Sequence, residues 1–291
     1  MTPKLESVLK EYPTFDAATI KSEIERILAS KKAQNANQSV YKTLLSLIDL
    51  TSLNTTDTEE SIENFTQKVN DFGDAYPEYP TVAAICVYPN MVRVVKEVLT
   101  ENVDIAAVTA GFPHSQTFME VKMAETSLAV MDGATEIDIV QSVGKLLEGK
   151  YDEIIEEIQE IKAACKDAAL KVILESGALK IEEIRLASIL AMEAGADFIK
   201  TSTGKQQPAA TLEAAWIMCH CIKTYHSLTG RKVGFKAAGG ISTTDEALSY
   251  YCLVEEILGE EWLNKDLFRF GASRLANNIL SDLEGKQTIF F

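Results

Sequence analysis

Long apolar segments are missing from this 291-residue sequence, and no run approaches the roughly 18 residues that a membrane-spanning helix needs. The first residues, Met1 to Lys4, are not followed by the apolar stretch of a secretion signal. The five cysteines are odd in number and lie in apolar or helical contexts, which is typical of free thiols in a reducing compartment. We therefore expect a cytoplasmic protein with no membrane partner.

Basic residues are also scarce. The chain has 28 Lys and Arg against 43 Asp and Glu, which gives a formal net charge of −15. Nucleic acids are bound by clustered Lys and Arg, so we expect no nucleic-acid partner. A small anionic ligand remains compatible with this charge, because a few backbone N–H groups and one lysine can reverse the field locally.

Metal and cofactor motifs are absent as well. The three histidines, His114, His220 and His226, have no spacing typical of a metal site backed by carboxylates. The sequence has no Gly-x-Gly-x-x-Gly, no Walker A motif and no Gly-x-Ser-x-Gly elbow. We predict neither a bound metal nor a cofactor, which disfavours nicotinamide, ATP and serine-hydrolase chemistry.

What the sequence does contain, from residue 44 onward, is a regular alternation of short apolar runs and helical stretches. Eight runs have the length and β-branched content of buried strands: Leu44–Thr51, Val82–Tyr88, Ile105–Ala110, Glu136–Gln141, Leu170–Ser176, Phe198–Ser202, Lys232–Ala238 and Phe268–Ala272. The helical stretches between them include Val121–Met131, Tyr151–Ala164, Glu182–Ala194 and Thr211–Tyr225. Eight β–α units in about 235 residues favour a (β/α)₈ barrel over an open doubly wound sheet. We assign residues 41–291 to this single catalytic domain with a short C-terminal tail.

Residues 1–40 look like an appended helical extension. Ile20, Ile24, Ile27 and Leu28 form one apolar helical face, and Asp16 is placed to cap the helix start. The following polar stretch, 30–38, is expected to be weakly structured. The helix is expected to cover one end of the barrel or to contact another subunit.

Three lysines interrupt apolar strands, where an unpaired charge is costly: Lys171, Lys200 and Lys236. The segments 133–138 and 195–200 share a frame in which Asp138 and Lys200 each lie five residues after a helix-ending glycine. This echo predicts that both side chains lie at a similar height near the mouth of the barrel. Two close, desolvated ammonium groups lower each other's pKa, and a neutral lysine can attack a carbonyl to form a Schiff base. These features do not tell which lysine is the nucleophile.

The loops after the last three predicted strands are suited to phosphate. They are Thr201–Lys205, Ala238–Ser242 and Gly271–Arg274. Glycines let backbone N–H groups approach an anion, and helices that begin just beyond them add their positive ends. Phosphate sites after strands 7 and 8 recur in this fold.

Taken in order, the motifs resemble the deoxyribose-phosphate aldolase family. The matching segments are Leu47–Thr51, Ala83–Pro89, Phe112–His114, Glu136–Val140, Leu170–Gly177, Ala194–Lys205, Val233–Lys236 and Arg269–Ser273, and they cover about residues 44 to 280. The resemblance implies a metal-independent class I aldolase on a TIM barrel and a homodimer. The implied reaction is the reversible cleavage of 2-deoxy-D-ribose 5-phosphate to D-glyceraldehyde 3-phosphate and acetaldehyde, in deoxynucleotide catabolism.

The resemblance also implies roles for individual residues. Lys200 matches the Schiff-base lysine, Lys236 matches the second lysine that lowers its pKa, and Asp138 matches the aspartate that works with water as general acid and base. Asp49 and Lys171 match supporting polar groups of the catalytic set. The implied substrate-binding residues are Cys86, Thr51, Thr203, Gly204, Lys205, Gly239, Gly240, Gly271 and Ser273.

The sequence departs from the family pattern in four places. Ala237 stands where a proline is common, Ser242 where arginine is frequent, and Arg274 where serine is frequent. The segment 287–291 contains no tyrosine, although many members end in a tail whose terminal tyrosine reaches the active site. We therefore expect no proton transfer by the tail.

Two other functions fit the same barrel. One is a different lysine-dependent aldolase, either transaldolase-like or acting on a larger sugar bisphosphate, which would need a second anion site. The other is a non-catalytic phosphosugar-binding barrel. Comparing donors side by side separates the first from the expected reaction, and tight binding without turnover would indicate the second.

Overall fold

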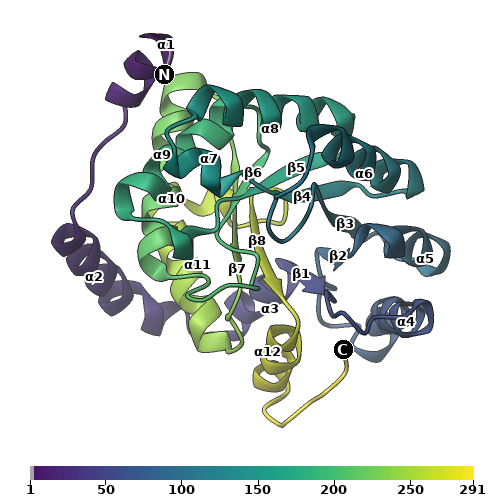
Figure 1. Cartoon of the computed structure of the whole chain (residues 1–291). Coiled ribbons are helices and arrows are strands. Elements are labelled where there is room, and N and C mark those ends of the chain that lie inside the picture. The colour runs from purple at the N-terminus through teal and green to yellow at the C-terminus, as the bar shows by residue number, and fades with distance from the viewer. Residues whose placement is uncertain (1–2) are drawn as a thin grey trace.

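Eight parallel strands form a closed barrel in the computed structural model, which describes residues 3–291 (Figure 1). The strands are β1 (Ile48–Thr51), β2 (Ala84–Val87), β3 (Asp104–Thr109), β4 (Glu136–Val140), β5 (Ala169–Ile173), β6 (Phe198–Lys200), β7 (Gly234–Ala238) and β8 (Phe268–Ala272). Each strand pairs with the next in sequence, and β1 pairs with β8 to close the barrel. The predicted (β/α)₈ barrel is confirmed.

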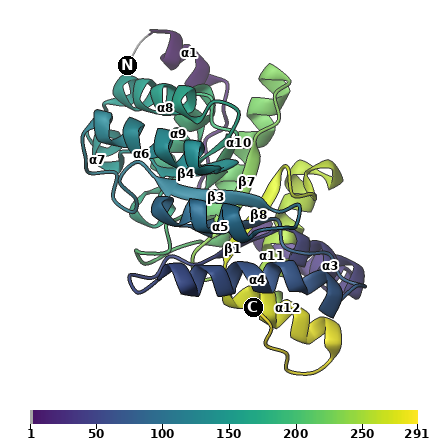
Figure 2. The same ribbon diagram turned by 90° about the vertical axis from the view of Figure 1, so that its right-hand side faces the viewer.

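Helices cover the outside of this barrel (Figures 1 and 2). The α-helices are α1 (Pro3–Lys10), α2 (Ala17–Asn35), α3 (Gln38–Ser46), α4 (Glu59–Ala75), α5 (Val92–Val98), α6 (Met119–Asp132), α7 (Val143–Leu147), α8 (Tyr151–Cys165), α9 (Ile181–Glu193), α10 (Leu212–Thr229), α11 (Thr244–Leu258) and α12 (Arg274–Glu284). Single 3₁₀ turns occur at Pro89–Met91, Ser176–Ala178 and Glu260–Trp262. Right-handed β–α–β crossovers of this length place each helix against the strands it connects.

Several helix starts follow directly from the sequence. Asp16, Asn37, Thr58, Thr211 and Thr243 each accept a hydrogen bond from a backbone N–H in the first turn of the helix that follows. Such caps satisfy one of the free N–H groups at a helix start and contribute about 1 kcal/mol each. The predicted cap at Asp16 is therefore confirmed.

The expected weak structure of residues 30–38 is wrong, because α2 continues to Asn35. Lys31 forms ion pairs with Glu255 and Glu256 of α11 at 3.1 and 3.4 Å, and the Asn35 side chain donates to Glu255 at 2.9 Å. These contacts order a polar segment that has little apolar periodicity of its own. The helix packs along α10 and α11 on the outside of the barrel wall and not over one end of the barrel; its contact with another subunit stays a prediction.

The first strand is shorter than predicted. Leu44 and Leu45 belong to α3, which crosses the expected boundary at residue 40, and β1 begins only at Ile48. Both leucines are fully buried. Because the buried end of α3 is followed almost directly by the buried strand β1, the two form one apolar run in the sequence. The boundary between helix and strand cannot be located from such a run.

The C-terminal tail lies against α4 and α12, and Figure 2 shows the C terminus beside these helices. The ring of Phe291 stacks on Phe72 of α4 with a centroid separation of 5.0 Å. The Asn277 side-chain oxygen accepts hydrogen bonds from the backbone N–H groups of Phe290 and Phe291 at 2.8 and 3.0 Å. These contacts hold the end of the chain on the outer helices α4 and α12.

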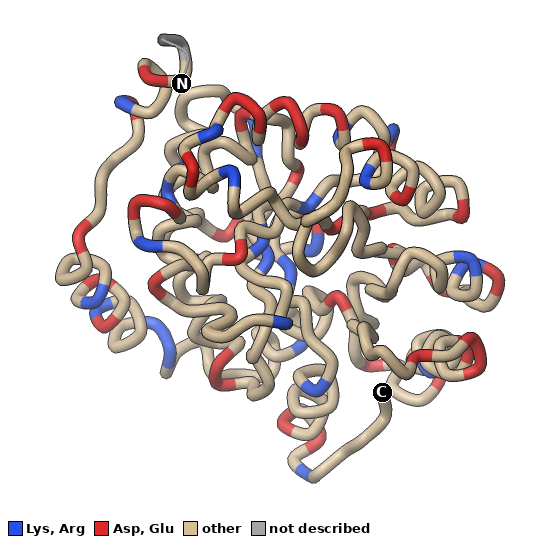
Figure 3. The backbone as a smooth tube through the Cα atoms, in the orientation of Figure 1, with Lys and Arg blue, Asp and Glu red and all other residues tan. Residues whose placement is uncertain are grey.

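Charge is distributed unevenly between the wall and the centre. Acidic residues are spread over the outer helices, whereas several basic residues lie at the centre of the barrel (Figure 3). Within residues 3–291, no helix is both long and apolar enough to cross a membrane.

Candidate active site

The centre of the barrel holds a group of charged side chains that are almost fully buried. The Lys200 amine donates to a carboxylate oxygen of Asp138 at 2.7 Å, and the Lys236 amine donates to the same oxygen at 2.8 Å. Lys236 also pairs with Asp49, and Lys171 lies 3.3 Å from the other oxygen of Asp138. The five residues assigned to catalysis on sequence grounds thus come from β1, β4, β5, β6 and β7 and meet in one cluster.

Strand register explains this meeting. Lys200 pairs with Lys236 between β6 and β7, and Asp138 pairs with Lys171 between β4 and β5. Side chains of alternate strands share a layer of the barrel interior, which brings Asp138 and Lys200 together. The repeated sequence frame predicts that Asp138 and Lys200 lie at a similar height in the barrel, and their hydrogen bond confirms this. Lys236 lies in the middle of β7.

The two lysines of the pair differ in their electrostatics. Burial lowers the pKa of Lys200, Asp138 opposes this effect and Lys236 adds to it, so that the pKa falls below its ordinary value. Burial also disfavours the charged form of Lys236, but Asp138 and Asp49 together outweigh it and raise its pKa. The expected lowering by the neighbouring lysine is found at Lys200, whereas at Lys236 the two carboxylates determine the net direction. Lys200 is the one lysine of this pair that is poised to lose its proton.

Both carboxylates of the cluster are held in the ionised form. Burial would raise the pKa of Asp138, but Lys200, Lys236 and Lys171 outweigh burial and hold it well below its usual range. The pKa of Asp49 is lowered in the same way by Lys236 and Arg269. A carboxylate of this kind can accept a proton only when a neighbouring cation loses its charge.

A cavity of about 230 Å³ opens above Lys200 at the carboxyl ends of the strands. It is lined by the three glycine-containing loops that the sequence assigns to phosphate and by the loop after β1. Of the predicted binding residues, eight line it: Thr51, Thr203, Gly204, Lys205, Gly239, Gly240, Gly271 and Ser273. Ser242 and Arg274, two of the four departures from the family pattern, also lie in its wall.

Two loops of this wall approach each other at glycines. A Cβ on Gly239, whose φ is +95°, would lie 2.7 Å from the Cβ of Ala209 and 3.1 Å from the Cα of Gly204. Gly204 itself has a φ of +76°. Only glycine fits both this conformation and this separation. The backbones of these two loops therefore lie close together in the cavity wall.

A carboxylate on the neighbouring loop fixes this wall from behind. Glu175 lies two residues after the end of β5 and has a left-handed φ of 55°. It accepts a hydrogen bond from the Thr203 hydroxyl at 2.6 Å and one from the Thr203 N–H at 3.2 Å. The Thr203 hydroxyl in turn accepts from the Lys205 N–H at 3.1 Å. The chain from Glu175 to Lys205 sets the shape of the loop after β6.

Comparison with known proteins agrees with this arrangement. The sequence matches the DeoC/LacD family of aldolases over residues 43–252. The chain belongs to this aldolase family. A human deoxyribose-phosphate aldolase is 41% identical over 82% of this chain and 78% of its own length. A Caenorhabditis elegans relative is 42% identical over 92% of this chain and 94% of its own length.

Solved structures give the same picture. An aldolase named QR15 is 32% identical, covers 83% of this chain and 96% of its own, and has a TM-score of 0.68. The deoxyribose phosphate aldolase from Aeropyrum pernix, described as a unique tetrameric structure, has a TM-score of 0.66 over 92% of this chain and 98% of its own. At 23% identity it supports the fold alone.

Cys86 occupies a deeper place in this aldolase than the other predicted binding residues. It is 1% exposed in β2 and is not among the residues that line the cavity. Burial raises the pKa of its thiol. Its surroundings are those of a small buried hydrophobe next to the lysine pair.

Sequence reasoning missed several residues of the aldolase site. Leu53 and Asn54 line the cavity, and Glu175 supports its wall. Glu136 and Arg269 pair with the buried cluster. The last two carry the same signal that identified the lysines, a charged residue inside an apolar strand, whereas Leu53 and Asn54 lie in a loop with no distinctive pattern.

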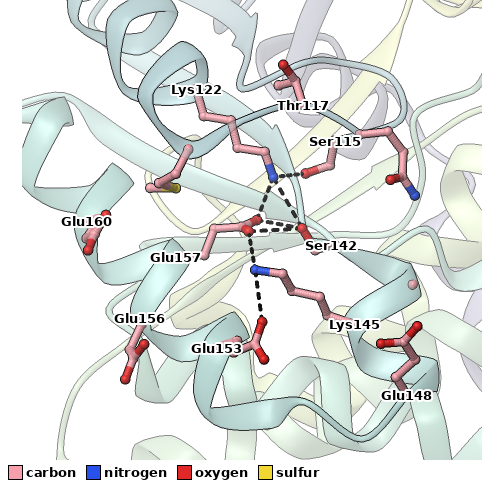
Figure 4. A pocket seen from close by; sticks show the side chains of 13 residues that line it. Ser115, Thr117, Lys122, Ser142, Lys145, Glu148, Glu153, Glu156, Glu157 and Glu160 are labelled. Carbon is pink, nitrogen blue, oxygen red and sulfur yellow. Dashed lines mark hydrogen bonds and ion pairs between the residues drawn. The ribbon is translucent and has the colours of Figure 1, made fainter.

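A second, larger cavity of about 460 Å³ lies outside the catalytic cluster, next to α6, α7 and α8 (Figure 4). Some of its polar groups are engaged with one another. The Lys122 amine donates to Ser115 at 2.7 Å and to Glu157 at 2.8 Å, and Lys145 pairs with Glu157 at 3.2 Å. The wall contains none of the predicted site residues, and five glutamates give it an acidic character.

Proposed function

We propose that this chain is a deoxyribose-phosphate aldolase that works through a Schiff base on Lys200. The observation that carries the proposal is the position of Lys200. Its amine lies at the floor of the 230 Å³ cavity, has a lowered pKa and faces three loops suited to phosphate. The names of the relatives at about 41% identity support the same substrate, 2-deoxy-D-ribose 5-phosphate.

The reaction begins when the neutral amine of Lys200 attacks C1 of the open-chain sugar. Loss of water from the carbinolamine gives an iminium. A base then removes the proton of the C3 hydroxyl, the C2–C3 bond breaks, and its electrons move into the iminium to give a neutral enamine. D-glyceraldehyde 3-phosphate leaves. Protonation of the enamine carbon and hydrolysis release acetaldehyde and restore the lysine.

Asp138 and Lys236 are the groups proposed to move protons. The Asp138 carboxylate touches both lysine amines, so it can accept a proton when Lys200 becomes neutral and return it through water. Lys236 stays protonated because Asp138 and Asp49 raise its pKa. Its positive charge favours the neutral form of Lys200 and stabilises negative charge that develops on the substrate oxygens.

Phosphate would be held in the upper part of the cavity. The backbone turns at Gly204, Gly239 and Gly240 and the side chains of Lys205 and Arg274 line this part. A larger bisphosphate donor needs a second anion site. The 460 Å³ cavity beside α6, α7 and α8 is lined by five glutamates, whose negative charge would repel a second phosphate.

The test compares donors side by side in an enzyme-coupled assay with EDTA present. We expect cleavage of 2-deoxyribose 5-phosphate and at least tenfold less activity on fructose 1,6-bisphosphate or fructose 6-phosphate. Lys200→Leu should reduce cleavage to a trace, and Lys180→Leu on the outer surface is the matched control. Cleavage retained in Lys200→Leu would overturn the assignment, and tight binding without turnover would indicate a binding protein.

We also propose a homodimer, supported by an apolar stripe along α6. Phe118, Val121, Leu128 and Met131 are 78%, 49%, 60% and 73% exposed and recur at helical spacing on one face. Exposed apolar patches of this kind mark association sites, and a second copy of the stripe would be self-complementary about a two-fold axis. Sedimentation of the wild type and of Leu128→Glu tests the proposal. A monomeric wild type would contradict it.

A further inference from the structure

The buried cluster continues below the catalytic lysines to the floor of the barrel. Arg269 of β8 donates to Asp49 at 2.6 Å and to Glu136 at 2.8 Å, and Lys171 also pairs with Glu136. Glu136 and Arg269 are 6% and 2% exposed. Solvent therefore screens these charges little, and each one affects the others across the cluster.

The charges of the cluster are not equal in number. Its cations are Lys171, Lys200, Lys236 and Arg269, and its anions are Asp49, Glu136 and Asp138. Four positive charges face three negative ones when Lys200 is protonated, and the cluster is neutral when Lys200 is a free amine. Excess charge inside a protein is expensive, so the neutral state is favoured.

The other ionisable groups around the cluster do not change this excess of one positive charge. Below it, Asp104 is 34% exposed and lies between Arg269 and the surface residue Lys265. On β2, Cys86 stays a neutral thiol because burial raises its pKa. At the mouth, Lys205 and Glu175 carry opposite charges on neighbouring loops.

We propose that Arg269 and Glu136 are positioning residues of the aldolase that set the charge balance around Lys200: Arg269 favours its neutral form, and Glu136 limits this effect. They touch neither the cavity nor the Lys200 amine and act through Asp49, Lys171 and Asp138. The inference rests on the proposed function, since it assigns Lys200 as the nucleophile. The iminium carries the extra positive charge again, so the same balance favours the step in which bond cleavage converts it to the neutral enamine.

Removal of either residue should change the protonation of Lys200 in opposite directions. Arg269→Met deletes one cation, so the cluster becomes neutral with Lys200 protonated, and the amine is harder to deprotonate. Glu136→Gln deletes one anion and makes the amine easier to deprotonate. In the double variant the cluster again has equal numbers of positive and negative groups besides Lys200. Arg269→Lys keeps the same number of positive groups as the wild type.

The experiment follows imine formation at Lys200 as a function of pH. Each protein is incubated briefly with acetaldehyde between pH 5 and 10 and reduced with borohydride, and the labelled peptide is quantified against wild type treated in parallel. We expect the midpoint of the acid limb to rise by about one pH unit in Arg269→Met and to fall by about one unit in Glu136→Gln. The double variant and Arg269→Lys should lie close to the wild type.

These shifts separate charge balance from a structural role, because misfolding lowers the amplitude of labelling and leaves its midpoint in place. Equal midpoints in all folded variants, or two single variants that move in the same direction, would overturn the inference. Should Arg269→Met fail to fold, folded Glu136→Gln without a downward shift overturns it alone. Absence of the Lys200 adduct in the wild type would instead count against the proposed function.

Discussion

Glu175→Gln should weaken recognition of the substrate phosphate and leave the chemistry at Lys200 intact. The Glu175 carboxylate accepts from both the hydroxyl and the N–H of Thr203. Glutamine has nearly the same size but replaces one acceptor oxygen with an NH₂ group, which cannot accept from Thr203. The loop after β6 then loses its fixed shape, and Lys205 and Gly204 of that loop line the cavity.

The size of the effect follows from the burial of the bond. Glu175 is 5% exposed, and the hydroxyl bond is 2.6 Å long. A buried hydrogen bond to a charged group contributes about 1.5–3 kcal/mol. Since about 1.4 kcal/mol corresponds to a factor of ten, full transfer of this loss to phosphate binding would cost about 10- to 100-fold. The loop can partly relax, so we expect about a tenfold loss.

The assay compares two substrates that differ only in the phosphate. For 2-deoxyribose 5-phosphate, kcat/KM should fall about tenfold, mainly through KM. For unphosphorylated 2-deoxyribose it should change less than twofold. Glu157→Gln is the matched control, because Glu157 is a buried, hydrogen-bonded glutamate of the second cavity. An equal loss on both substrates in Glu175→Gln, or a selective loss in the control, would refute the reasoning.

Three further predictions follow from the same structure. Gly271→Ala places a Cβ 2.8 Å from the Cβ of Ala238 and 3.2 Å from the Cε of Lys236, so kcat should fall by about tenfold or more, which steady-state kinetics will show. Phe291→Ala removes one ring from the aromatic cluster on α4 and should lower Tm by about 2–5 °C with kcat unchanged, in a thermal melt and a rate assay. The pKa of Asp138 in the folded protein is below its ordinary value of 3.8. The ionised carboxylate therefore stabilises the folded protein fully above pH 3.8, and this stabilisation is lost as the pH falls through the folded-state pKa. In urea unfolding, the midpoint of the wild type should fall below about pH 4, and that of Asp138→Asn should fall less steeply.

The order of the strands and the central pair could be predicted from the sequence because both depend on local patterns. Buried parallel strands appear as short apolar runs, and β8 has the predicted bounds, Phe268–Ala272. The repeated frame before Asp138 and Lys200 placed two distant residues at one height. A charged residue inside an apolar run is itself a local signal.

Other features depend on tertiary contacts that no local pattern reveals. The polar end of α2 is ordered by ion pairs to α11, more than 200 residues away in the sequence. The different pKa values of Lys200 and Lys236 depend on how many carboxylates each amine meets. The left-handed conformation of Glu175 is a backbone property imposed by its loop.

Reductive trapping of an acetaldehyde adduct tests the central claim most directly. The protein is incubated with acetaldehyde and EDTA, reduced with borohydride, and examined by intact mass and peptide mapping. The account predicts a single added ethyl group of about 28 Da on Lys200 and none in Lys200→Leu. An adduct on Lys171 or Lys236 would keep the class of enzyme and contradict the assignment of the nucleophile. No adduct, or one scattered over surface lysines, would contradict the Schiff-base mechanism itself.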